Sequence, residues 1–119
     1  MFAHLARHAA TDIVVSAVSV EESLRGRLAV LNRRLDSATR VQAYSSLLRT
    51  VRFFHTLTLI EFDTACEQQF QQLLAMRLRV GTQDLKIAAT ALANALVVTR
   101  NQRDFALVPG LTLEDWSVP

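Results

Sequence analysis

The sequence is poor in the residues that interrupt or cross-link a chain, with three glycines, two prolines and one cysteine among 119 residues. Half of the residues are hydrophobic, which excludes a disordered or collagen-like polymer. A single cysteine excludes a disulfide framework and a cysteine-based zinc knuckle. No apolar run approaches the roughly 20 residues that a membrane span requires. These absences predict a soluble globular protein that forms a single domain over residues 1–119.

The charged residues are unusual in kind more than in number. Twelve of the thirteen cations are arginine, and Lys86 is the exception. The planar guanidinium group suits phosphate and carboxylate, so an acidic partner is one interpretation. Solvated arginines on helix faces are the other, and a net charge of +2 does not decide between them. The N-terminal residues are basic, but Asp12 interrupts them before any long apolar segment, so we expect no secretory signal and a cytoplasmic protein.

Short β-branched runs alternate with helical patterns along the chain. Strands are predicted at 13–18, 57–60, 96–99 and, as a last edge strand, 111–113. Helices are predicted at 2–9, 19–35, 38–55, 63–78 and 84–95. This alternation predicts an α/β fold with a small, mostly parallel sheet flanked by helices. Ligands of such sheets bind beyond the carboxyl ends of the strands.

Two of the predicted helices carry an apolar stripe on one face, and we expect the stripe of helix 63–78 to be its inner face. The stripe of helix 38–55 consists of Tyr44, Leu47, Leu48, Val51 and Phe54. The stripe of helix 63–78 consists of Cys66, Phe70, Leu73 and Leu74. No basic residue is near Cys66 in the sequence, so we expect a core thiol rather than a nucleophile.

Acidic residues follow the predicted strands. They are Glu21, Glu22, Glu61, Asp63 and, five residues past Thr99, Asp104. Asp84 stands at the start of a helix, four residues before Ala88 of its apolar stripe. Carboxylates gathered at one sheet edge repel one another by roughly a few kcal/mol per pair. A divalent cation removes this repulsion, and oxygen ligands suit Mg²⁺ or Mn²⁺.

Each of these carboxylates also has an ordinary structural explanation. Glu22 could be the last residue of a capping box that begins at Ser19. The helix dipole favours a carboxylate at Asp84, and Asp104 could belong to a turn. The spacing of the residues leaves both interpretations open.

Other familiar sites are disfavoured. His4 and His8 are four residues apart, but neither His55 nor any other residue bears a fixed relation to them as a third metal ligand. The three glycines are too far apart to form a phosphate-binding loop, which disfavours nucleotide-binding folds.

Four segments in the same order resemble the PIN-domain ribonucleases of the VapC toxin type. They are Ser16–Gly26, Gly81–Ala89, Leu96–Phe105 and Val108–Trp116. The resemblance extends from about residue 13 to the end of the sequence, and the run from 81 to 105 is its most specific part.

This resemblance implies an α/β sandwich whose acidic cluster holds Mg²⁺ or Mn²⁺ and hydrolyses RNA. The family's catalytic and metal-binding residues correspond to Glu22, Asp84 and Asp104, and its supporting positions to Thr99 and Asn101. The metal would orient and activate a water molecule. Such toxins are typically inhibited by a cognate antitoxin and commonly dimerise. RNA, an antitoxin and a second copy of the chain are therefore the expected partners.

The sequence departs from the family at its beginning. Family members start with a central strand that ends in a Leu-Asp-Thr-like motif, whose aspartate is the first metal ligand. This sequence has no such segment, and Asp12 precedes its strand and is badly placed to substitute. We therefore expect either an upstream start or a truncated relative, with a perturbed sheet or a strand supplied by a second chain. The alternative to an active ribonuclease is a weak or inactive relative that binds an antitoxin or its own copy through the helices at 21–55.

Overall fold

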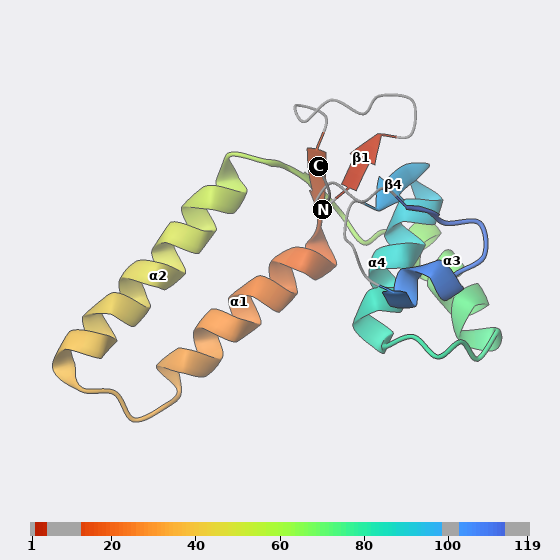
Figure 1. Ribbon diagram of the computed structural model, residues 1–119. Helices are drawn as coiled ribbons and strands as arrows, with labels where there is room; N and C mark the ends of the chain where they lie inside the picture. The colour runs from red at the N-terminus through yellow and green to blue at the C-terminus, as the bar shows by residue number, and fades with distance from the viewer. Residues whose placement is uncertain (1, 5–12, 99–102, 114–119) are drawn as a thin grey trace.

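The computed structural model describes residues 2–4, 13–98 and 103–113 (Figure 1). In chain order its elements are β1 (Phe2–His4), β2 (Ile13–Ser16), α1 (Ala17–Leu31), α2 (Ser37–His55), β3 (Thr58–Ile60), α3 (Thr64–Ala75), α4 (Thr82–Ala93), β4 (Leu96–Val98), the 3₁₀ helix η2 (Arg103–Leu107) and β5 (Thr112–Leu113). The α/β class predicted from the sequence is confirmed.

The strands form one sheet in the order β3-β2-β1-β4-β5. β2 pairs in parallel with β3, and β4 pairs in parallel with β5. β1 lies in the centre and pairs antiparallel with both β2 and β4. Four strands therefore run in one direction and the central strand opposes them. This arrangement confirms a small, mostly parallel sheet and the predicted edge strand at its end.

The centre of the sheet differs from the sequence prediction. A helix was predicted at 2–9, but Phe2–His4 is a strand, and the remainder of that range lies outside the described residues. The facing edges of β2 and β4 present backbone N–H and C=O groups that need partners, and Phe2–His4 supplies them. The chain's own residues rather than a second chain therefore occupy the central position of the sheet.

The hydrophobic core lies where α3 and α4 pack together and meet β2 and β4. From Ile87 to Ala91, every residue of α4 is buried. Phe105 of η2 is fully buried in the same core. In α3, the predicted inner face is confirmed for Cys66, Phe70 and Leu73, whereas Leu74 is exposed.

α1 and α2 form a helical hairpin that projects from the rest of the molecule (Figure 1). In α2, which is described throughout, Ala43 is the one buried residue. In the apolar stripe of α2, the side chains of Tyr44, Leu48 and Val51 are exposed. α2 packs mainly on α1, and a pair of helices covers one side of each and leaves the other sides to solvent. Within the described part of the chain, no helix is both long and apolar enough to cross a membrane.

Candidate acidic site

The first part of the site is the junction between β2 and α1. Ser16, the last residue of β2, is the N-cap of α1, and its hydroxyl accepts a hydrogen bond from the Ser19 N–H at 3.1 Å. The same hydroxyl donates to Ser19 Oγ at 3.1 Å, and both serines are buried. α1 therefore begins at Ala17 instead of at Ser19. Glu22 consequently lies in the second turn, so its explanation as a member of a Ser19 capping box is wrong.

The second part is the beginning of α4. Gly81 is the N-cap, and its lack of a side chain leaves the first turn without a side-chain cap. Asp84 lies in that first turn and is half-buried, directly before the buried Leu85. A helix-start carboxylate was predicted here, and the position is confirmed. The helix dipole stabilises the negative charge in this turn whatever else Asp84 does.

A hydrogen bond connects the two helix starts. Gln83 Nε2 donates to Glu21 Oε1 at 3.0 Å, and Lys86 Nζ donates to Gln83 Oε1 at 3.2 Å. Glu22 follows Glu21 in the sequence, and Asp84 follows Gln83, so each of these predicted site residues is next to one partner of the first bond. The structure thus brings the turns that carry these two predicted site residues against each other, close to the carboxyl end of β2.

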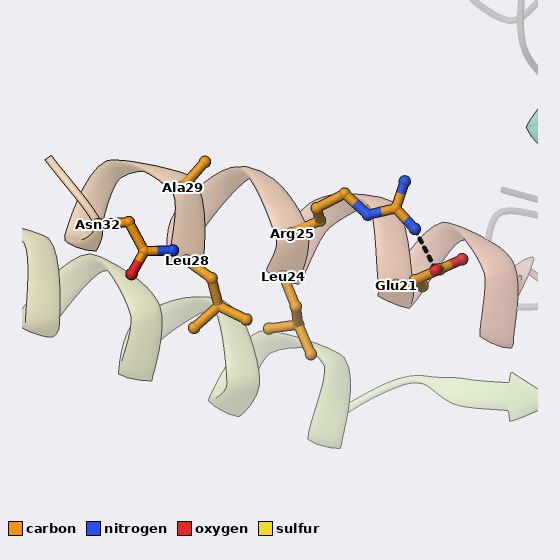
Figure 2. A pocket seen from close by; sticks show the side chains of 6 residues that line it. All are labelled: Glu21, Leu24, Arg25, Leu28, Ala29 and Asn32. Carbon is orange, nitrogen blue, oxygen red and sulfur yellow. Dashed lines mark hydrogen bonds and ion pairs between the residues drawn. The ribbon is translucent and has the colours of Figure 1, made fainter.

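Glu21 was noted in the sequence but not assigned a role, and the structure places it at the centre of this contact. The hydrogen bond from Gln83 lowers the pKa of the Glu21 carboxyl, and the nearby Arg25 guanidinium lowers the pKa further. Arg25 forms an ion pair with Glu21 one helical turn away (Figure 2). Glu21 is therefore held in its charged form. Gln83 is 62 residues away in sequence, so no local pattern could have revealed this contact.

A hollow of about 330 Å³ adjoins this contact. Its lining residues come from α1, α3, α4 and the loop after β3, and they are Ala17, Val18, Glu21, Phe62, Glu67 and Lys86. Glu67 and Lys86 were missed by sequence reasoning because they become neighbours of Glu21 only when α3 and α4 pack beside α1. Two carboxylates and one ammonium group thus border this hollow, at the sheet edge where ligands of parallel sheets bind.

The remaining predicted residues lie at or beyond the limits of the described chain. The backbone of Asp104 belongs to η2, which packs on α4, but its side chain is outside the described part. Thr99 and Asn101 also lie outside the described residues. Among the side chains that are described, no three His, Cys, Asp or Glu residues form a metal-binding group. A shared site of Glu22, Asp84 and Asp104 therefore stays a prediction.

Cys66 behaves as expected of a core thiol. Its side chain is fully buried, and burial raises the pKa of the thiol above its usual value. Sγ donates a hydrogen bond to the Glu61 carbonyl oxygen at 3.7 Å. A thiol with a raised pKa is a poor nucleophile at neutral pH.

Comparison with known proteins points to one family. The chain is 36% identical over 69 residues to ribonuclease VapC2 of Rickettsia felis, and the match covers 54% of this chain and 52% of the relative. The matched region is thus about half the length of that curated relative. No family model matches the sequence.

Solved structures agree with this match over more of the chain. The VapBC2 structure of Rickettsia felis bound to a promoter DNA fragment superposes with a TM-score of 0.68 at 27% identity. DNA-bound VapBC of Salmonella typhimurium gives a TM-score of 0.70 at 27% identity, and each of these two matches covers 87% of this chain and 74% of the other. VapBC-5 of Mycobacterium tuberculosis, from a family of toxin–antitoxin systems, gives 0.58 at 25% identity, covering 83% and 76%. In sequence and in fold, the chain is therefore similar to VapC proteins of VapBC toxin–antitoxin systems.

Proposed function

We propose that the protein is a metal-dependent endoribonuclease and the toxin component of a toxin–antitoxin pair. The observation that carries the proposal is the Gln83–Glu21 hydrogen bond, which joins the turns bearing Asp84 and Glu22 at the carboxyl end of a parallel strand. A relative named as a ribonuclease and structures of VapBC pairs support the same assignment.

The carboxylates suit a hard divalent cation. Glu22 and Asp84 provide oxygen donors from two different helices, and Asp104 is the proposed third ligand, with Thr99 and Asn101 as supporting residues. Oxygen donors of this kind favour Mg²⁺ or Mn²⁺. When bound, such an ion would polarise a phosphodiester oxygen and activate a water molecule. The protein's own contribution is to position Glu22 and Asp84, through the Ser16 cap on α1 and through the buried Leu85 and Ile87 that anchor the start of α4.

Substitution of Asp84 tests the proposal. Asp84→Asn is expected to abolish Mg²⁺- or Mn²⁺-dependent cleavage of a fluorogenic RNA, and to change the melting temperature little, because relief of carboxylate repulsion offsets the lost interaction with the helix dipole. Asp36→Asn is the matched control, since it makes the same change at an exposed N-cap at the far end of the hairpin. Unchanged cleavage by Asp84→Asn would contradict the assignment.

A second candidate function is supported by the exposed stripe on α2. Val41, Tyr44, Leu48 and Val51 are all exposed, at spacings of three, four and three residues that are typical of a helix–helix seam. We propose as the alternative that an inactive relative uses this surface to self-associate or to bind an antitoxin. Sedimentation of the purified chain tests self-association: a dimer that Leu48→Ser dissociates supports it, and a monomer at all concentrations opposes it.

A further inference from the structure

The positive charge of the protein is concentrated on one element. The hairpin 17–55 contains seven arginines and three acidic residues, a net charge of +4, whereas the remaining residues together carry a net charge of −2. All seven of these arginines are exposed. The basic character of the chain therefore belongs to the projecting hairpin and not to the body that carries the acidic site.

One side of the hairpin forms a groove between its two helices. α1 contributes Ser23 and Arg27, and α2 contributes Arg49, Thr50, Phe53 and Phe54, around a volume of about 380 Å³. Arginines thus line the groove from both helices, and two phenylalanines come from α2. Among these described lining residues none is acidic. By contrast, the surface of α1 drawn in Figure 2 includes an acidic residue, Glu21, which forms an ion pair with Arg25.

The groove side chains are held in place but keep binding capacity. Arg27 Nε donates to Thr50 Oγ1 at 3.3 Å, which fixes the guanidinium across the groove and uses one of its five N–H donors. The Phe53 and Phe54 rings lie 5.7 Å apart between centroids and are tilted by 54°. Phe53 is 49% exposed. An exposed aromatic ring in a groove that two arginines also line is a surface that hydrophobic burial alone does not explain.

Two guanidinium groups and an exposed ring in one groove match the chemistry of single-stranded nucleic acid. Phosphates bind arginine, and unpaired bases stack on aromatic rings. A base-paired duplex would hide the faces that Phe53 could contact. The volume lies near the lower end of the roughly 300–1,000 Å³ range of ligand sites, which suits a nucleotide better than an α-helix about 10 Å across.

We propose that the groove formed by Ser23, Arg27, Arg49, Thr50, Phe53 and Phe54 binds single-stranded RNA, outside the acidic site. Arg27 and Arg49 contact phosphates, and Phe53 stacks with a base. The inference rests on the proposed function in that RNA is the substrate held there. Binding itself requires neither the carboxylates nor a metal.

The test measures RNA binding where no cleavage can occur. Fluorescence anisotropy of a labelled oligouridine of about 12 nucleotides, a length within the usual range of site sizes, is recorded in EDTA with the full chain. Arg49→Gln is expected to weaken binding about threefold to tenfold and to reduce the slope of log affinity against log salt by about 0.7. Phe53→Leu is expected to weaken binding about fivefold or more, with the slope unchanged, because it removes stacking and no charge.

Arg33→Gln is the matched control, because it removes one exposed arginine from the loop after α1 and outside the groove. Equal weakening by Arg33→Gln and Arg49→Gln would overturn the proposal in favour of diffuse attraction. Competition by polyglutamate as strong as that by unlabelled RNA would also overturn it, because the groove would then bind an acidic peptide as well as it binds RNA.

The same assay separates this proposal from the proposed function. The groove variants are compared for RNA binding in EDTA, and Asp84→Asn is measured for cleavage with Mg²⁺ or Mn²⁺. If groove substitutions leave RNA binding intact while Asp84→Asn abolishes cleavage, the groove assignment fails and the ribonuclease assignment stands. If they weaken RNA binding in a chain that cleaves no RNA, the groove assignment stands alone.

Discussion

At the scale of single residues, the position of the candidate site depends on Ser16. Its buried hydroxyl accepts a hydrogen bond from the Ser19 N–H and donates one to the Ser19 hydroxyl. Ser16 is therefore both the last residue of β2 and the N-cap of α1. Ser16→Ala removes the cap and leaves a buried Ser19 hydroxyl without this partner. We expect a loss of about 1–2 kcal/mol in the free energy of unfolding, measured with urea. Ser45→Ala on the exposed side of α2 is the control, with an expected change within about 0.5 kcal/mol.

Aspartates cap two other helices, and their charge makes stability depend on pH. Asp36 accepts a hydrogen bond from the Thr39 N–H at 2.7 Å, and Asp63 accepts one from the Cys66 N–H at 3.1 Å. These bonds lower the pKa of both carboxyls in the folded state. The stabilisation is therefore complete above the unfolded pKa of about 4, and it is lost as the pH falls through the lower folded pKa.

Asparagine also caps helices but does not titrate, so an aspartate-to-asparagine substitution separates the stabilisation by the cap hydrogen bond from its dependence on pH. In urea unfolding between about pH 6 and pH 3, the variant Asp63→Asn is expected to lose less stability on acidification than the unmodified chain. Glu61→Gln, at an exposed position before the same helix, is the control. An acid dependence of Asp63→Asn identical to that of the unmodified chain would show that the cap charge does not contribute.

The sequence was informative for residues whose role is local. The position of Asp84 follows from the helix that begins beside it, and the structure confirms that helix start. The contact between Glu21 and Gln83 depends on how α1 and α4 pack, which no spacing along the chain encodes. The explanation of Glu22 as a capping-box residue was wrong because it assumed that the helix begins at Ser19. Ser16 and Ser19 are both favourable N-cap residues, and the buried Ser16 at the end of β2 is the one that caps α1.

At the scale of elements, the central strand shows the limit of local patterns. Phe2, Leu5, Ala6 and Ala9 have helical spacing, but Phe2–His4 pairs between two strands that follow later in the chain. Hydrogen bonds to both neighbours outweigh a weak helical preference over a short segment. The strands β2 and β4 were predictable because their β-branched runs are buried.

The middle of α1 contains a glycine that its surroundings do not require. A Cβ atom added at Gly26 would have no neighbour within 4 Å. Gly26→Ala is therefore expected to raise the free energy of unfolding by about 0.5–1 kcal/mol, since alanine restricts the unfolded chain and favours the helix. Gly110 is the contrasting position, because its φ of 78° disfavours any side chain. Gly110→Ala is expected to destabilise by about 1 kcal/mol. Stabilisation by both substitutions would refute this account.

At the scale of the whole molecule, the chain is less compact than its length predicts. Its radius of gyration is 16.0 Å, against about 13.5 Å expected for a compact domain of this length. The α1–α2 hairpin accounts for the difference, since it projects from the body (Figure 1). This projection also explains why much of the apolar stripe of α2 is exposed. A stripe in a sequence indicates which side of a helix is apolar, but not whether another layer covers it.

The hairpin and the body should therefore open with different free energies. The distal part of the hairpin, residues 28–45, is largely exposed, whereas residues 87–91 of α4 are entirely buried. Local opening needs less free energy where fewer apolar side chains lose their contacts. In hydrogen exchange followed by mass spectrometry, amides of 28–45 are expected to exchange about tenfold or more faster than those of 87–91. Equal protection of both segments would mean that the molecule opens as one unit, so that the hairpin is stabilised by more than its contact with the body.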